Sequence, residues 1–141
     1  MGKAANSSIS LKQIHVTDNF WNKYVHLVKD VIIPYQWDIL NDKLEDVETS
    51  HCIENFKIAA GEKEGEFQGA VFQDTDVAKW LEAVGFVLNY ERDEKLEELA
   101  DETIELIGRA QQPDGYLNTY FTIKEPVSYT HLRAHETKAN L

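Results

Sequence analysis

The chain has 141 residues, and its 25 Asp and Glu outnumber its 14 Lys and Arg, so the formal net charge is -11. With 43% hydrophobic residues, this length permits one globular domain that buries roughly 68% of its unfolded surface. The acidic excess argues against nucleic acid and anionic membranes as partners, because both are bound through Lys and Arg. No apolar run reaches the roughly 18 residues of a membrane span and no signal peptide is recognisable, so we expect a cytoplasmic protein.

The cysteine content restricts the chemistry of the chain. Cys52 is the only cysteine, which excludes an intrachain disulfide and a zinc site made of several thiolates of this chain. A lone cysteine is more often a small buried hydrophobic residue than a nucleophile. We therefore expect Cys52 to lie in the core.

The composition changes after Pro126. Residues 127–141 hold two of the five His and a net charge of +1, whereas residues 1–126 carry 12 basic and 24 acidic side chains. The last stretch has neither a sustained helical stripe nor a strand alternation, and it resembles translated sequencing-adapter read-through. A natural disordered tail and a short helix are the alternatives, the latter with His131 and His135 spaced like a metal pair. We expect residues 1–8 to be disordered.

The first predicted element lies within residues 9–16. Ile9 and Leu11 form one short apolar alternation, and Ile14 and Val16 form another. The two alternations are out of register, which predicts an entry strand or a bulged strand. We therefore expect a short N-terminal β segment.

A long helix is predicted next, because apolar residues recur at helical spacing between positions 20 and 35. Thr17 or Asp18 can cap it. Pro34 lacks a backbone N–H and clashes with the preceding turn, so it predicts a kink or a new helix start. The second piece is expected to extend to about Asp46.

A shorter helix and a loop follow. Ser50 can cap this helix, and Gly61 is expected to end it in the left-handed conformation that such helix ends favour. Residues 61–69 are rich in Gly and Glu, which predicts an exposed loop.

Two further helices are predicted, and the link between them is only residues 90–92. Asp74, Thr75 or Asp76 is expected to cap the first helix, and Asp93 begins the second. A connection this short forces an antiparallel helical hairpin. The second helix carries six carboxylates away from its apolar stripe, which is typical of a solvated outer face. The fold class is therefore mainly α.

Antiparallel pairing brings residues 72–76 and 111–118 to the same end of the hairpin, about 25 Å from its turn. Both segments combine aromatic, amide and carboxylate side chains, which stack on sugar faces and bond sugar hydroxyls. The candidate substrate-binding residues at this rim are Phe72, Gln73, Asp74, Asp76, Asp114, Tyr116 and Asn118. Structural roles compete with this interpretation. Helix capping is favoured for Asp74 or Asp76, core packing for Phe72 and Tyr116, and a turn at residues 112–115 can use Asp114.

Four segments form a longer pattern in this order. They are residues 31–37 (VIIPYQW), 55–61 (NFKIAAG), 71–83 (VFQDTDVAKWLEA) and 111–119 (QQPDGYLNT). Together they resemble the N-terminal part of glycoside hydrolase family 127, the β-L-arabinofuranosidases. The resemblance runs from about Ile9 to Pro126, so we expect residues 9–126 to be an incomplete catalytic domain.

The resemblance implies the first hairpins of an (α/α)6 barrel and a retaining exo-glycosidase that removes terminal β-L-arabinofuranose from oligosaccharides. It also implies a zinc-bound Cys thiolate as nucleophile, with a Glu as ligand or acid/base, but in relatives these residues lie downstream of the matched part. Cys52 matches none of those positions, so we expect neither a catalytic residue nor a metal ligand here. The dimer contacts of a homodimer are expected in domains beyond the matched residues 9–126.

The sequence thus leaves two functional hypotheses. The first is an N-terminal fragment of a β-L-arabinofuranosidase that is inactive by itself, because the zinc and cysteine site is missing. The alternative is a non-catalytic helical module that binds a carbohydrate or a protein through the wide apolar stripe of its first helix.

Overall fold

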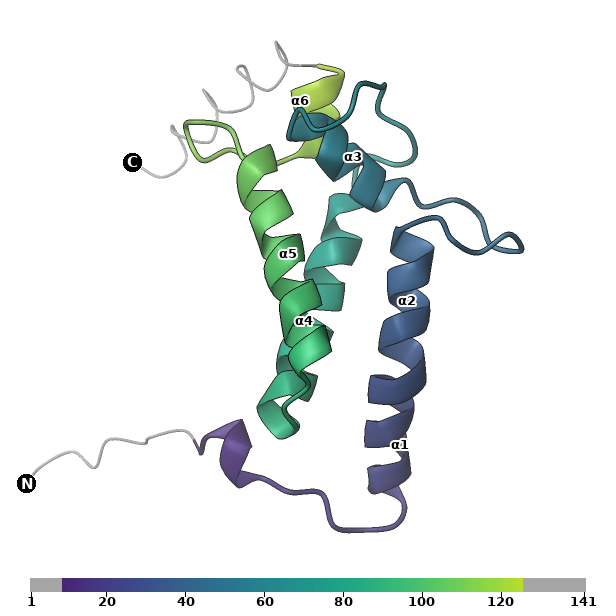
Figure 1. Ribbon diagram of the computed structural model, residues 1–141, viewed down its shortest axis with the longest axis vertical. Helices are drawn as coiled ribbons and strands as arrows, with labels where there is room; N and C mark the ends of the chain where they lie inside the picture. The colour runs from purple at the N-terminus through teal and green to yellow at the C-terminus, as the bar shows by residue number, and fades with distance from the viewer. Residues whose placement is uncertain (1–8, 126–141) are drawn as a thin grey trace, which may run out of the picture.

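The computed structural model describes residues 9–125, whose regular secondary structure is entirely helical and which contain no strand (Figure 1). The elements are a 3-10 turn η1 (Leu11–Gln13), α1 (Trp21–Leu27), a π-helical turn η2 (Val28–Ile32), α2 (Ile33–Leu40), α3 (Cys52–Ala59), α4 (Asp74–Tyr90), α5 (Glu94–Ala110) and α6 (Thr119–Ile123). The predictions for residues 1–8 and 127–141, including the His131 and His135 pair, lie outside the described residues. Within 9–125, no helix combines the length and the hydrophobicity that crossing a membrane requires.

The predicted N-terminal β segment is wrong, because η1 occupies its place. The Ser10 hydroxyl accepts a hydrogen bond from the backbone N–H of Lys12 at 3.4 Å and supports the tight turn. The backbone N–H of Ile14 then donates to the carbonyl of Leu11 at 3.1 Å. A strand needs a neighbouring strand for its backbone hydrogen bonds, and the described chain provides none.

The long first helix consists of α1, η2 and α2 in direct succession. The Asp18 carboxylate accepts hydrogen bonds from the backbone N–H groups of Phe20 and Trp21, at 3.0 and 2.7 Å, so Asp18 caps the helix as predicted. Pro34 lies in the first turn of α2, directly after the π turn. Since proline has no N–H to donate, the predicted interruption takes the form of a wider turn before it and the chain stays helical.

The connection from α2 to α3 departs from the prediction. α2 ends at Leu40, well before residue 46, and Asp42 then adopts a left-handed backbone with φ 55°. The residue before α3 is His51, also with φ 55°, and no side chain caps this helix, so the predicted Ser50 cap is wrong. Gly61 follows α3 with φ 73°, as predicted.

The hairpin of α4 and α5 is confirmed, with residues 91–93 as its link. The Asp93 carboxylate accepts a hydrogen bond from the backbone N–H of Leu96 at 3.1 Å and caps α5. The buried face of α5 consists of Ala100, Thr103, Leu106 and Ala110. Its predicted solvated face is exposed and consists of Glu94, Glu97, Glu98, Asp101, Glu102 and Glu105.

The core lies where α2, α3 and α5 pack against α4 and where α3 packs against α5. Trp80 of α4 is central: it is 4% exposed, its ring centroid lies 4.5 Å from that of Trp37, and its indole N–H donates to the Ile33 carbonyl at 3.1 Å. Phe67 is also buried, so the predicted exposed loop at residues 61–69 is exposed only in part.

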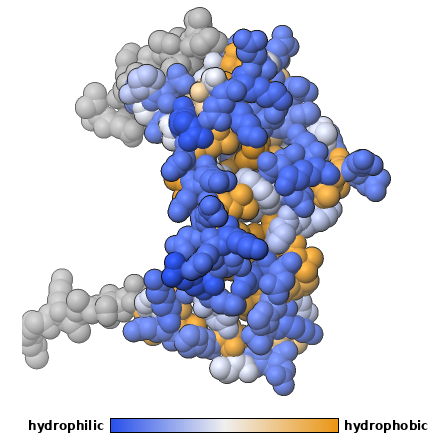
Figure 2. All heavy atoms as spheres, in the orientation of Figure 1, coloured by the Kyte–Doolittle hydropathy of each residue, from blue (hydrophilic) through white to orange (hydrophobic). Residues whose placement is uncertain are grey.

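One side of the first helix remains uncovered. Trp21 is 61% exposed and Val31 54%, and Phe86 of α4 is 57% exposed beside α1. A cleft of about 430 Å³ between α1 and the end of α4 is lined almost entirely by apolar side chains. Figure 2 shows such apolar residues reaching the surface between the polar ones. Large exposed apolar surfaces usually mark a contact with another chain segment or molecule.

Candidate functional site

The starts of α4 and α6 are joined by the carboxylate of Asp74. Its Oδ2 accepts a hydrogen bond from the backbone N–H of Thr119 at 2.7 Å, and its Oδ1 accepts one from the Thr119 hydroxyl at 2.6 Å. Thr119 is 1% exposed, so both polar groups depend on this carboxylate rather than on water. The segments around Asp74 and Asn118 therefore meet at one end of the hairpin, as its antiparallel arrangement predicts.

Two other predicted rim residues hold the neighbouring backbone. The Gln73 side-chain oxygen accepts a hydrogen bond from the backbone N–H of Ala70 at 2.9 Å. The Asn118 side-chain oxygen accepts one from the backbone N–H of Phe121 at 3.1 Å and caps α6. Both side chains thus shape this end of the hairpin, in addition to any role toward a ligand.

The predicted turn at residues 112–115 is present. The Gly115 N–H donates to the Gln112 carbonyl at 2.8 Å, and Gly115 has φ 90°, a conformation that other residues adopt with strain. The Asp114 carboxylate accepts a hydrogen bond from the backbone N–H of Tyr116 at 3.0 Å. Asp114 therefore serves the turn, and the Tyr116 ring is half-buried beside it.

The structural roles predicted for Asp74, Asp76 and Phe72 are wrong. Neither Asp74 nor Asp76 caps α4, because both lie inside its first turn and Gln73 precedes it with an already helical backbone. Asp76 instead forms an ion pair with Lys79 at 3.0 Å. Phe72, expected in the core, is 71% exposed.

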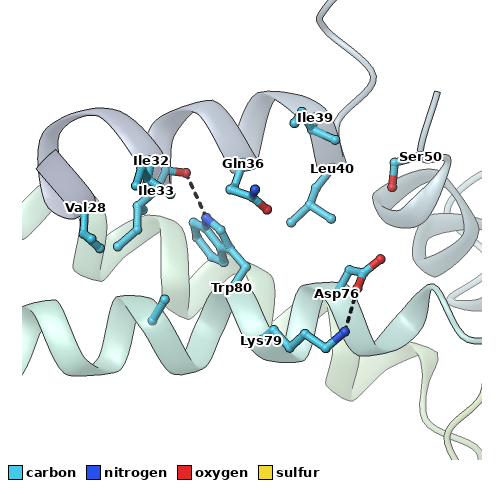
Figure 3. A pocket seen from close by; sticks show the side chains of 11 residues that line it. Val28, Ile32, Ile33, Gln36, Ile39, Leu40, Ser50, Asp76, Lys79 and Trp80 are labelled. Atoms are coloured by element: carbon cyan, nitrogen blue, oxygen red, sulfur yellow. Dashed lines mark hydrogen bonds and ion pairs between the residues drawn. The ribbon is translucent and has the colours of Figure 1, made fainter. Parts of the chain in front are cut away.

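A groove of about 250 Å³ separates α2 from α4 (Figure 3). Its floor includes Ile33, Leu40 and Trp80, and its polar side chains are Gln36, Ser50, Asp76 and Lys79. Among the predicted rim residues, Asp76 lines this groove. Sequence analysis missed Gln36 and Ser50. The helical spacing of Ile33, Gln36 and Leu40 places them on one face of α2 and was the available signal for Gln36.

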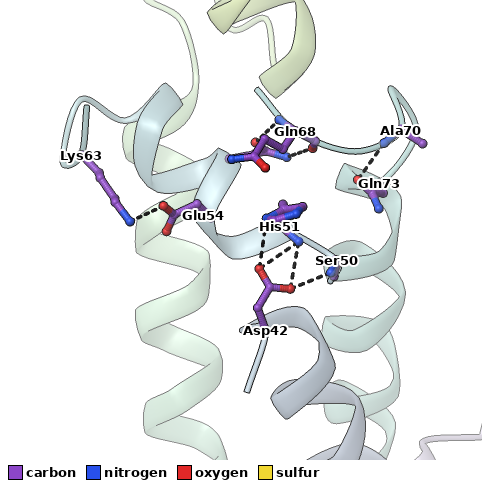
Figure 4. A network of polar contacts seen from close by, with 9 residues as sticks. Asp42, Ser50, His51, Glu54, Lys63, Gln68, Ala70 and Gln73 are labelled. Atoms are coloured by element: carbon purple, nitrogen blue, oxygen red, sulfur yellow. Dashed lines mark hydrogen bonds and ion pairs between the residues drawn. The ribbon is translucent and has the colours of Figure 1, made fainter. Parts of the chain in front are cut away.

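A polar network fixes the junction of α2 and α3 (Figure 4). The Asp42 carboxylate accepts hydrogen bonds from the backbone N–H groups of Ser50 at 2.6 Å and His51 at 3.0 Å, and it lies 3.4 Å from the His51 Nδ1. Asp42 and His51 are the two non-glycine residues with positive φ in the described chain. The carboxylate thus stabilises a strained connection that brings Ser50 to the end of the groove.

The described residues do not fit the zinc ion that the family resemblance implies. Cys52 is 0% exposed and its thiol donates a hydrogen bond to the Gln73 carbonyl at 2.9 Å. Burial, followed by the negative charge of Asp74, raises the pKa of this thiol from 9.0 to about 12. Zinc binds a thiolate and needs at least three protein ligands, and residues 9–125 contain no suitable group of three His, Cys, Asp or Glu side chains. Cys52 is a core residue, as predicted.

Comparison with known proteins identifies the family of the chain. Residues 13–140 match the family described as the β-L-arabinofuranosidase, GH127 catalytic domain. The chain is 41% identical over 126 residues to a non-reducing end β-L-arabinofuranosidase of Bifidobacterium longum subsp. longum, an alignment that covers 81% of this chain and 19% of that protein.

Solved structures agree with this assignment. The crystal structure of a GH127 β-L-arabinofuranosidase from Geobacillus stearothermophilus T6 matches with a TM-score of 0.80 and 63% identity, over 82% of this chain and 18% of that chain. A second GH127 β-arabinofuranosidase structure matches with a TM-score of 0.71 and 31% identity, over 83% of this chain and 18% of that one. The chain thus spans about a fifth of the length of these relatives. Because sequence and fold agree over most of its residues, the chain belongs to the GH127 β-L-arabinofuranosidase catalytic-domain family.

Proposed function

We propose that the chain forms the N-terminal part of a retaining exo-glycosidase that removes terminal β-L-arabinofuranose from oligosaccharides, and that it is inactive by itself. The observation that carries this proposal is the match to β-L-arabinofuranosidases in sequence and fold, over only 18% to 19% of their length. The nucleophilic cysteine and the zinc of such an enzyme then belong to polypeptide beyond the matched part. Cys52, buried and protonated, takes no part in the chemistry.

The uncovered side of the first helix supports an incomplete domain. Trp21, Val31 and Phe86 are each more than half exposed, and the cleft beside them is lined by apolar side chains. Further helices of a larger domain would cover such a surface. In this proposal α4 and α5 form one hairpin of an (α/α)6 barrel, with the solvated face of α5 outward.

The rim residues divide into two roles in this proposal. Gln73, Asp74, Asp114 and Asn118 hold the backbone of the rim through the hydrogen bonds described above. Phe72, Asp76 and Tyr116 are assigned to contact with the sugar: an exposed ring, a carboxylate beside a groove and a half-buried phenol supply stacking and hydroxyl recognition.

A chimera tests the proposal. Residues 9–125 replace the matching segment of the Geobacillus enzyme, and hydrolysis of an aryl β-L-arabinofuranoside is measured for the chimera and for the 141-residue chain. We expect turnover by the chimera and none by the chain alone. A Cys52→Ser chimera is the control and retains activity, because the nucleophile lies elsewhere. Turnover by the chain alone, abolished by Cys52→Ser, contradicts the proposal.

The exposed aromatic surface also favours a second candidate, a helical module that binds a carbohydrate or a protein without catalysis. This candidate requires the 141-residue chain to be self-sufficient. Monomeric behaviour supports it, whereas self-association and strong binding of a hydrophobic dye support the incomplete domain.

A further inference from the structure

The first helix carries a regular row of apolar side chains that is open to solvent. Each member of the row is 41% to 55% exposed, and the members follow one another at intervals of three or four residues. They are Phe20, Tyr24, Leu27, Val31 and Tyr35, and we call them the outer stripe. In Figure 1, α1 and α2 form the edge of the molecule opposite α5, so the outer stripe is accessible to a second molecule.

The spacing of the outer stripe indicates which kind of element fits it. Its first four members are separated by 4, 3 and 4 residues. This is the spacing of the a and d positions of a coiled coil, which present one seam to a facing helix. An extended peptide has side chains that alternate with a period of two and does not match this spacing. The outer stripe therefore suits a helix that lies alongside it.

Two opposite charges flank the outer stripe. Lys23 directly precedes Tyr24, and its Nζ lies 5.0 Å from the ring centroid of Phe20. Asp30 directly precedes Val31, and it lies 3.9 Å from His26 on its own helix, a contact that is an ion pair only when His26 is protonated. Both charged residues thus occupy the position before an a residue, which is the g position of a coiled coil.

These charges are complementary to those of a second copy in one orientation. When two identical helices pair in antiparallel orientation, their g positions face each other, so Lys23 of each copy meets Asp30 of the other. In a parallel pair, g positions face e positions, which are Trp21 and Val28 and carry no charge. Antiparallel pairing therefore forms two ion pairs between the copies, and parallel pairing forms none.

The acidic excess of the chain does not lie on this helix. Residues 19–37 contain two Lys and one Asp, whereas the whole chain has a net charge of -11. Of the two lysines, Lys29 is already paired with Glu91. At physiological salt, a Debye length of about 8 Å screens the carboxylates on more distant elements. Two copies can therefore approach each other through this helix.

We propose that the outer stripe is an interface between two copies of this chain, which pair their first helices in antiparallel orientation around a twofold axis. Because both copies use the same surface, the contact closes at a dimer. The inference goes beyond the proposed function and uses a surface other than the further domains in which dimer contacts were expected. In a longer polypeptide, a helix of the same domain takes the place of the second copy.

The size of the outer stripe sets the expected affinity. A fully buried aromatic side chain covers roughly 150–250 Å², so five half-exposed side chains from each copy bury on the order of 800 Å². This area lies below the roughly 1,200–2,000 Å² of stable complexes and within the range of transient ones. The dimer is therefore weak and reversible, with a Kd on the order of 100 µM.

Sedimentation equilibrium of the 141-residue chain at micromolar to millimolar concentration tests the proposal. The average mass is expected to rise reversibly from 16.2 kDa toward twice this value and no further. Leu27→Ser, in the middle of the outer stripe, weakens dimerisation without a change in charge. A monomer at every concentration, assemblies larger than a dimer, or a dimer unaffected by Leu27→Ser overturns the proposal.

Charge reversal tests the orientation. Lys23→Glu alone, or Asp30→Lys alone, places like charges opposite each other at both contacts and weakens dimerisation about tenfold. A mixture of the two variants has opposite charges at both contacts, so it dimerises as the unchanged chain does. Lys57→Glu is the control, because it makes the same change in net charge on an exposed position of α3 and leaves dimerisation unaltered. A mixture that associates as weakly as its components, or equal effects of Lys23→Glu and Lys57→Glu, overturns the proposal. The chimera experiment does not depend on these results, so this interface and the glycosidase function fail separately.

Discussion

The contact between Asp74 and Thr119 makes a quantitative prediction about stability. Asp74→Ala removes an acceptor of two hydrogen bonds, at 2.7 and 2.6 Å, and leaves the N–H and hydroxyl of a residue that is 1% exposed without a partner. A hydrogen bond to a charged group contributes roughly 1.5–3 kcal/mol. Both bonds share one half-buried carboxylate, so their effects add incompletely, and we expect a loss of about 3 kcal/mol.

Thermal unfolding of the 141-residue chain, followed by circular dichroism, measures this loss. For a chain of this length, about 3 kcal/mol corresponds to a decrease in Tm of roughly 10 °C. Asp76→Ala is the matched control, because both aspartates lie in the first turn of α4 and interact similarly with the helix dipole. The ion pair of Asp76 with Lys79 is exposed, so this variant loses about 0.5 kcal/mol or less.

A double-mutant cycle separates the contact from other effects of the substitutions. Thr119→Val removes the hydroxyl alone and is expected to lose about 1.5 kcal/mol. In the Asp74→Ala background the same change costs less, with a coupling of about 1 kcal/mol or more. Equal losses for Asp74→Ala and Asp76→Ala, or additive effects of Asp74→Ala and Thr119→Val, would refute the assignment of Asp74 as the link between α4 and α6.

Three further predictions follow from the backbone and from buried groups. Because the pKa of Cys52 is raised to about 12 in the folded chain, the unfolded chain loses this proton first as the pH rises above 9. The contribution of Cys52 to the free energy of unfolding is therefore constant below about pH 9 and falls by up to about 1.4 kcal/mol per pH unit between 9 and 12; urea titrations of Cys52→Ala lack this part of the slope. Gly69→Ala loses about 1–3 kcal/mol of stability, because Gly69 has φ 92° and an added Cβ meets the Gln73 side chain. Gly85→Ala is the control: Gly85 lies within α4 with free space around it, so this change gains up to about 1 kcal/mol. Equal Tm changes for the two variants contradict this prediction. Lys29 is largely buried and forms an ion pair with Glu91 at 3.0 Å, so Lys29→Met loses about 1 kcal/mol. Lys57→Met is the control, because Lys57 is exposed on α3 and forms no ion pair among residues 9–125; a Tm independent of both changes would exclude a role of the Lys29–Glu91 pair.

The hairpin could be predicted because its signals are local. Asp93 caps α5 from three residues away, the link allows only an antiparallel return, and the carboxylates of α5 lie opposite its apolar stripe. The cap at Asp18 and the left-handed Gly61 are local features of the same kind. Each depends on a few consecutive residues, which a sequence displays directly.

The errors arose where a distant partner decides the outcome. Asp74 has the residue type and position of a helix cap, but it binds Thr119, which is 45 residues away in the chain. The alternation at residues 9–16 has the spacing of a strand, yet no neighbouring strand exists in the described chain. Gln36 and Ser50 line a common groove only because α2 packs against α4 and Asp42 shapes the turn between them.

The carboxylate of Asp42 has a consequence for the evolution of this end of the molecule. By binding the backbone of Ser50 and His51, it closes the base of the loop formed by residues 43–49 and holds the start of α3 close to the end of α2. Doubling the length of a flexible loop costs only about 0.6 kcal/mol in closure entropy. Insertions and substitutions in this loop can therefore reshape the surface beside the groove while the helical core stays intact.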